Sequence, residues 1–86
     1  MSKVTVRYWA AAKAAARMPE ESVEAATLAE ALEAVVAGRR PDDPLRTVLA
    51  RSSFLVNANP VGRAAKESVL LDDGALVEVL PPFAGG

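Results

Sequence analysis

The sequence has 86 residues, of which 51% are hydrophobic, and ten Lys and Arg against eleven Asp and Glu leave a net charge of −1. This length fits one domain whose core is only just large enough to offset the chain entropy lost on folding. No apolar run approaches the ~20 residues of a membrane helix, no signal segment opens the chain, and no basic run is interleaved with aromatics. We therefore expect a soluble, cytoplasmic protein that binds neither membrane nor nucleic acid.

Cysteine and histidine are both absent from the sequence. Their absence removes disulfides, thiolate nucleophiles, thiolate or imidazole metal ligands and the commonest general base. A conventional hydrolase or redox enzyme would have few groups to work with. We therefore expect no metal site, no bound cofactor and no independent enzymatic activity.

Residues 4–9 predict the first strand, because β-branched and aromatic residues alternate there with polar ones. One face of it carries Val4, Val6 and Tyr8, and the other carries Thr5, Arg7 and Trp9. Residues 10–18 are rich in alanine, and Pro19 follows them, which predicts a short helical turn or a loop. Residues 20–26 predict a weaker second strand at a sheet edge, where glutamates would discourage pairing with another chain.

Thr27 and Glu30 form a capping box, in which the Thr27 hydroxyl accepts from the Glu30 N–H and the Glu30 carboxylate accepts from the Thr27 N–H. A helix therefore begins there, and its apolar residues recur at helical spacing at Leu28, Leu32, Val35 and Val36. Gly38 occupies the position where a left-handed residue commonly ends a helix. A shorter helical segment follows around residues 45–49, after a charged loop to which we assign no function.

The second half of the chain predicts three further strands. They cover residues 54–57, 69–71 and 75–80, with a turn at 57–60 and an Asp-Asp-Gly hairpin turn at 72–74. In the last strand Val77 and Val79 share one face, and Leu76, Glu78 and Leu80 share the other. The order strand, strand, helix, strand, strand, strand predicts an α+β fold, a sheet of about five strands covered on one side by one main helix.

Residues 1–80 therefore form the predicted domain, and residues 81–86 form a separate tail, Pro-Pro-Phe-Ala-Gly-Gly. Pro81 and Pro82 end the strand and keep the chain extended, so the tail could reach about 20 Å into a partner. Phe83 offers one apolar anchor, after which Ala84, Gly85 and Gly86 present little more than backbone. A frayed end is the alternative, but a frayed end needs no stiffening by prolines.

A glycine terminus leaves its carboxyl carbon accessible to a nucleophile. The carboxylate, with a pKa of roughly 3.3–3.7, is ionised at neutral pH and is a poor electrophile. Another protein must therefore activate it.

The chain resembles the ubiquitin-like sulfur carriers of β-grasp fold, and most closely the small subunits of molybdopterin synthases. The resemblance covers nearly the whole length, and its most specific part is the ending Leu-Asp-Asp-Gly-Ala-Leu-Val-Glu-Val-Leu-Pro-Pro-Phe-Ala-Gly-Gly. The other matching stretches are Val-Thr-Val-Arg-Tyr-Trp-Ala at 4–10, Thr-Leu-Ala-Glu-Ala-Leu at 27–32 and Leu-Val-Asn-Ala-Asn-Pro-Val at 55–61.

The resemblance implies that the first and last strands are parallel neighbours in a mixed sheet. It further implies that an activating enzyme of the ubiquitin E1 type adenylates Gly86 with ATP, and that a sulfur donor protein converts it to a thiocarboxylate. Gly86, with Gly85 before it, would then enter the large subunit of molybdopterin synthase and give sulfur to the pterin precursor of molybdenum cofactor. The partner-binding residues implied are Trp9, Pro60 or Val61, Leu80, Pro81, Pro82, Phe83 and Ala84.

Three alternatives remain open on the sequence. The carrier could serve thiamine, cysteine or thio-nucleoside synthesis, it could be a modifier joined to lysines through Gly86, or it could be an interaction module with an inert tail. Trp9 and Leu80 could also be single apolar surface residues without a partner, which are common.

Overall fold

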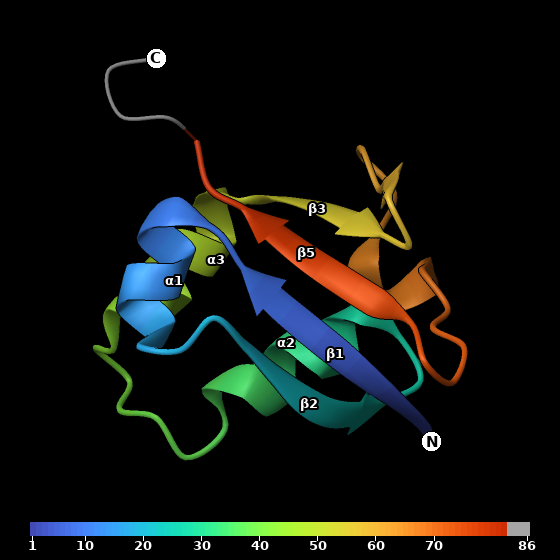
Figure 1. Cartoon of the computed structure of the whole chain (residues 1–86), viewed down its shortest axis with the longest axis horizontal. Helices are drawn as coiled ribbons and strands as arrows, with labels where there is room; N and C mark the ends of the chain where they lie inside the picture. Colours follow the sequence, from blue (N-terminus) through green and yellow to red (C-terminus); the bar gives the residue numbers. More distant parts are fainter. Residues whose placement is uncertain (83–86) are drawn as a thin grey trace.

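The computed structural model describes residues 1–82, and Figure 1 shows their arrangement. These residues form a five-stranded sheet, three α-helices and a 3₁₀ helix. In chain order the elements are β1 (Ser2–Tyr8), α1 (Ala10–Ala16), β2 (Glu20–Ala25), α2 (Leu28–Val36), α3 (Pro44–Arg51), β3 (Ser53–Val56), β4 (Asn59–Pro60), η1 (Lys66–Ser68) and β5 (Leu76–Leu80). Within this part of the chain, no helix has the length and hydropathy that crossing a membrane requires.

The strand order across the sheet is β2-β1-β5-β3-β4. β1 and β5 run parallel, and the other neighbours are antiparallel. This is the mixed sheet of a β-grasp fold, so the predicted fold class and the parallel pairing of the first and last strands are confirmed. The last strand therefore lies in the middle of the sheet, with a neighbour on each side.

One hydrophobic core lies between the sheet and the helices. The alternation of β1 and β5 puts Val4, Val6, Tyr8, Val77 and Val79 on the covered face, where each is at most 1% exposed. The helices add small and branched side chains from one stripe each, namely Ala12, Ala16, Leu28, Ala31, Val35, Leu45 and Leu49. In Figure 1, α2 lies behind the sheet, and α1 and α3 lie near the end where β1 and β5 finish. The opposite face of the sheet is left open.

The alanine-rich segment is a regular helix, α1. It ends at Ala16, two residues before Met18, the last residue ahead of Pro19. Arg17 adopts a left-handed conformation with φ 64°, and its N–H donates to the Lys13 carbonyl. At the start of α2, Thr27 accepts from the Glu30 N–H at 3.2 Å as predicted, but the Glu30 carboxylate accepts from the Ala26 N–H at 2.7 Å rather than from Thr27. Ala26 follows the end of β2, so its N–H is free for that bond.

Two predictions for residues 57–71 are wrong. Residues 69–71 do not form a strand: η1 precedes them, and Leu70 makes only an isolated bridge with Thr27. The fourth strand is instead β4, at Asn59–Pro60. Asn57 and Ala58, both at positive φ, make the hairpin turn before it, so Pro60 lies in an edge strand rather than in a turn.

The Asp-Asp-Gly segment is a turn but not a hairpin, because no strand precedes it. The Ala75 N–H donates to the Asp72 carbonyl at 3.0 Å, and Gly74 supplies a φ of +87°. Asp73 also accepts from the Lys3 N–H at 2.8 Å, which holds this turn against the start of β1. The turn thus positions the start of β5 beside β1.

Candidate functional site

The candidate site is the open face of the sheet at the end where β5 stops. Strand parity directs Arg7, Glu78, Leu55 and Pro60 to this face, and the registers align them in one row across β1, β5, β3 and β4. Glu20 of β2 extends the row and pairs with Arg7 at 3.0 Å. The row changes from charged at the β2 side to apolar at the β4 side.

Trp9 and Leu80 lie beside one another on adjacent strands where the tail begins, which is the placement that strand parity predicts. The parallel register pairs Tyr8 with Val79, so Trp9 follows beside Leu80, and the Trp9 N–H donates to the Val79 carbonyl at 3.3 Å. Trp9 is 45% exposed, and Leu80 is half-buried. An exposed tryptophan beside a leucine is an apolar contact surface of the kind that partners use.

Glu78 was not among the predicted site residues, yet it orients the tryptophan. Its carboxylate accepts a hydrogen bond from the indole Nε1–H of Trp9 at 3.0 Å. Strand parity does place Glu78 on the same face as Leu80, but the contact depends on the β1–β5 register, which the sequence alone does not give. The bond satisfies the polar end of the indole and leaves its apolar ring area facing outward.

Tyr8 anchors the end of β1 on the other side of the sheet. Its ring is buried, and its hydroxyl donates to Glu21 Oε2 at 2.6 Å. Burial, together with the hydrogen bond and the charge of Glu21, raises the pKa of Tyr8 well above its ordinary value. The hydroxyl therefore acts as a hydrogen-bond donor and not as a base.

Arg39, in the segment that follows α2, completes this anchor. Its guanidinium lies 3.9 Å from Glu21 and donates to the carbonyl of Ala16 at 3.2 Å and of Val35 at 3.0 Å. The cluster ties α1 and α2 to the first two strands. It thereby fixes the backbone from which Trp9 projects.

The two candidates after the third strand point in opposite directions. Pro60 pairs with Leu55 and is exposed on the open face. Val61 donates its N–H to the Phe54 carbonyl at 3.0 Å and packs against the core. Pro60 therefore belongs to the open face, whereas Val61 contributes to packing.

The tail begins directly after this surface. β5 ends at Leu80, and Pro81 is half-buried while Pro82 is exposed. The predicted site residues Phe83, Ala84, Gly85 and Gly86 lie outside the described residues.

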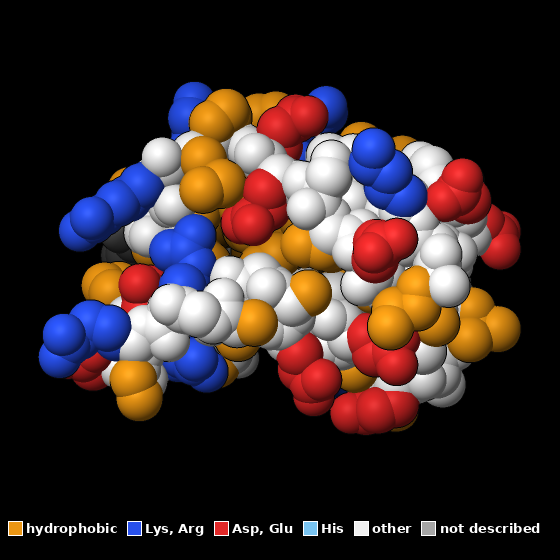
Figure 2. All heavy atoms as spheres, turned by 90° about the horizontal axis from the view of Figure 1, so that it is seen from below, with side chains coloured by type: hydrophobic (Ala, Val, Ile, Leu, Met, Phe, Trp, Pro, Cys, Tyr) orange, Lys and Arg blue, Asp and Glu red, His pale blue; other side chains and the backbone are white. Residues whose placement is uncertain are grey.

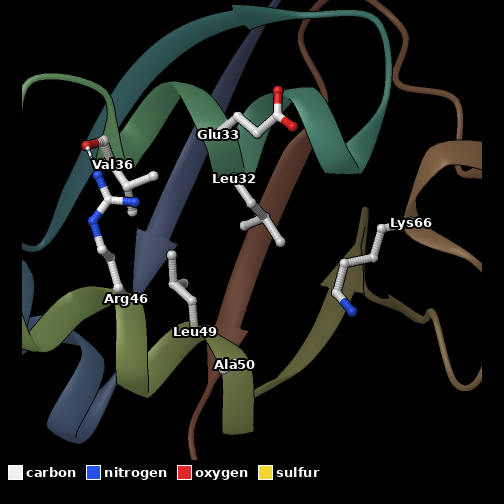
Figure 3. A pocket seen from close by; sticks show the side chains of 7 residues that line it. All are labelled: Leu32, Glu33, Val36, Arg46, Leu49, Ala50 and Lys66. Carbon is white, nitrogen blue, oxygen red and sulfur yellow. Dashed lines mark hydrogen bonds between the residues drawn. The ribbon is translucent and has the colours of Figure 1, made fainter. Parts of the chain in front are cut away.

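A hollow of about 280 Å³ lies on the helix side, between α2 and α3 (Figure 3). Its wall is mostly apolar, with Leu32 and Val36 from α2 and Leu49 from α3. Arg46 at its rim donates to the carbonyls of Val36 and Arg39 at 3.1 and 3.3 Å, so its guanidinium caps α2. Among residues 1–82 no group of acidic, histidine or cysteine side chains could hold a metal ion.

The sequence matches the ThiS family over residues 6–86, which includes the end of β1, all the other strands and the Gly-Gly ending. The chain belongs to the ThiS family. It is thus a member of a family of ubiquitin-like sulfur carriers. Among curated proteins none matches this sequence.

Solved structures share the fold of this ThiS-family chain. Small archaeal modifier protein 1 from Methanosarcina acetivorans superposes with a TM-score of 0.82 at 23% identity, over 100% of this chain and 98% of the other. A putative molybdopterin converting factor subunit 1 from Pyrococcus furiosus gives 0.75 at 23% identity, over 96% and 100%. In a complex of subunits 1 and 2 of molybdopterin-converting factor from Helicobacter pylori, the similar chain gives 0.69 at 24% identity, over 98% and 99%.

Proposed function

We propose that this ThiS-family chain is the small, sulfur-donating subunit of a molybdopterin synthase. In this proposal Gly86 is adenylated by an E1-like enzyme that uses ATP, receives sulfur as a thiocarboxylate from a donor protein, and gives it to the pterin precursor of molybdenum cofactor. The chain itself binds no cofactor and works in the cytoplasm. The family match, which runs through the Gly-Gly ending at residue 86, carries the proposal.

The open face supports the choice of a large-subunit partner. Trp9 and Leu80 lie on adjacent strands where the tail begins, and Pro60 lies two strands from β5 on the same open face, so one large docked protein would contact them and receive the tail together. The similar chain from Helicobacter pylori is solved as a complex of subunits 1 and 2, which supports a partner of this type.

Mass spectrometry tests the sulfur-carrier step. The full chain is incubated with an E1-like activating enzyme, ATP and a sulfur donor, and we expect one oxygen of the C-terminus to be replaced by sulfur. A variant lacking Gly86 is the matched control and should keep its mass. An unchanged mass for the full chain under conditions that convert an authentic carrier would contradict every sulfur-carrier assignment.

Reconstitution with a large subunit tests the pathway. We expect the thiocarboxylated chain to convert the pterin precursor to molybdopterin in the presence of that subunit, and the carboxylate form to remain inactive. Sulfur transfer only to a thiamine, cysteine or thio-nucleoside system would reassign the pathway while leaving the carrier chemistry intact.

A second candidate function is protein modification through Gly86. The similarity to a small archaeal modifier protein favours it, since that structure superposes with a TM-score of 0.82. The two functions differ in their products in cells. Conjugates of higher mass that disappear when Gly86 is deleted would identify a modifier.

A further inference from the structure

The two edges of the sheet differ in how much free backbone they present. β4 at one edge spans two residues, and one of these is Pro60, which has no N–H. β2 at the other edge spans six residues, Glu20–Ala25. Free N–H and C=O groups along an edge strand are a template to which an extended segment of another protein can add.

The backbone groups of β2 alternate between β1 and the outside. The Tyr8 N–H donates to the Pro19 carbonyl at 2.8 Å, which sets the alternation of the antiparallel ladder. By this alternation Glu20, Ser22 and Glu24 direct their N–H and C=O groups away from the sheet, and no hydrogen bond within residues 1–82 uses them. The free edge ends at Ala26. Its N–H donates to the Glu30 carboxylate, and its carbonyl accepts from the Leu71 N–H.

The exposed side chains along this edge are mostly acidic. Glu20, Ser22 and Glu24 are exposed. On the helix side, a shallow groove of about 360 Å³ between β2 and α2 is lined by Met1, Glu24, Glu30, Glu33, Ala34 and Ala37. Figure 2 views the molecule from the side on which β2 lies in Figure 1, and Asp and Glu side chains gather over the right half of that view.

β1 shows which sequence suits the side chains of β2. Its basic residues lie opposite glutamates, Lys3 opposite Glu24 and Arg7 opposite Glu20, and the second pair is in contact at 3.0 Å. Between these pairs Thr5 lies opposite Ser22, and Val4 and Val6 lie on the covered face. A strand added at the outer edge would meet the same β2 side chains from the other side, so the same pattern fits it.

A second copy of the chain does not fit this edge. An antiparallel pair of β2 strands centred on Ser22 would place Glu20 of one copy opposite Glu24 of the other. Like charges directly opposite one another destabilise a strand pair. The acidic edge thus disfavours self-association and favours a basic strand.

We propose that the β2 edge binds, by antiparallel strand addition, an extended segment of a partner protein with Lys or Arg at two positions four residues apart and, between them, two apolar residues that flank a small hydroxyl residue. This surface is separate from the root of the tail, because β1 lies between β2 and β5. The proposal therefore does not depend on the sulfur-carrier function.

The probe is the peptide Ser-Lys-Val-Thr-Val-Arg-Tyr, which has the sequence of residues 2–8. It is titrated into the isotope-labelled full chain, and amide chemical shifts and hydrogen exchange are measured. We expect shifts along β2 and slower exchange of the Ser22 and Glu24 amides. Methylation of the peptide's Thr nitrogen, which faces β2 in this register, should abolish binding, whereas methylation of a Val nitrogen, which faces away, should leave it intact.

Charge reversal tests the selectivity for a basic strand. Glu24→Lys should weaken peptide binding about three- to tenfold, and more at low salt. Glu67→Lys, the same change at an exposed glutamate in η1, should leave binding within about twofold. Any of three results would overturn the proposal. These are chemical shift changes confined to other surfaces, equal effects of the two methylations, and a dimer formed through β2 that light scattering detects.

Discussion

Truncation of Trp9 tests the assignment of the open face as the docking surface for a large subunit. The side chain is 45% exposed, and its Nε1–H already donates to Glu78 at 3.0 Å. Its orientation is therefore fixed before binding, which lowers the entropy lost on docking. Docking would then gain mainly from removing the remaining ring area from water.

The expected magnitude follows from that exposed area. A fully exposed tryptophan presents about 250 Å², so an exposed fraction of 45% leaves roughly 110 Å² for the partner to cover. At about 25 cal/mol per Å² this area contributes on the order of 2–3 kcal/mol. We expect Trp9→Ala to raise the Kd for the large subunit about 30- to 150-fold.

The assay is isothermal titration of the purified full chain with the large subunit, after thermal melting has shown that the variant folds. Leu70→Ala is the matched control, since Leu70 is 76% exposed and bridges to Thr27 at the end of the sheet away from Trp9. It should bind within about twofold of the parent chain. A Kd unchanged by Trp9→Ala, or an equal loss with Leu70→Ala, would refute the docking surface.

Three further predictions concern stability and are measured by thermal and denaturant unfolding. Tyr8→Phe removes the 2.6 Å hydrogen bond to Glu21 and should lower the free energy of unfolding by about 1–2 kcal/mol; an unchanged midpoint would contradict that bond. Because folding raises the pKa of Tyr8, its contribution is complete below its unfolded pKa of about 10 and falls as pH rises above it, and Tyr8→Phe should reduce this alkaline loss. Thr27→Ala removes the hydroxyl that caps the Glu30 N–H and should lower the free energy of unfolding by about 1 kcal/mol. Thr27→Ser, which keeps a hydroxyl, is the conservative control and should retain most of that free energy. Gly74→Ala places a Cβ in open space at φ +87°, so any loss, about 1 kcal/mol, measures backbone conformation rather than a clash.

Sequence patterns correctly predicted the strands that bury one face and leave the other open. The alternation in residues 4–9 and 75–80 separated buried from open side chains correctly, because a shift of one residue would have put valines in water. The short elements were harder. β4 is a two-residue strand that pairs with β3 through a tight turn, and Leu70 makes a single bridge with the distant Thr27, so both are too short to carry a side-chain pattern of their own.

The candidate site shows the same division. Parity in each strand was enough to place Trp9 and Leu80 on one face, whereas the choice between Pro60 and Val61 required the β3–β4 register. The contact between Glu78 and Trp9 joins residues 69 positions apart in sequence. Such a contact follows from the alignment of β1 with β5, and the local sequence of neither strand predicts that alignment.

The position of β5 explains how so small a domain holds Leu80, the residue from which the tail leaves. As the central strand it is held by ladders to β1 and β3, and its Val77 and Val79 side chains are fully buried. Releasing the root of the tail would require breaking both ladders and exposing the core, which is close to global unfolding. An edge strand would release its end by breaking one ladder. We therefore expect the amides of β5 to exchange only through global opening, with protection equal to the free energy of unfolding, so that the surface formed by Trp9 and Leu80 stays in place whether or not a partner is bound.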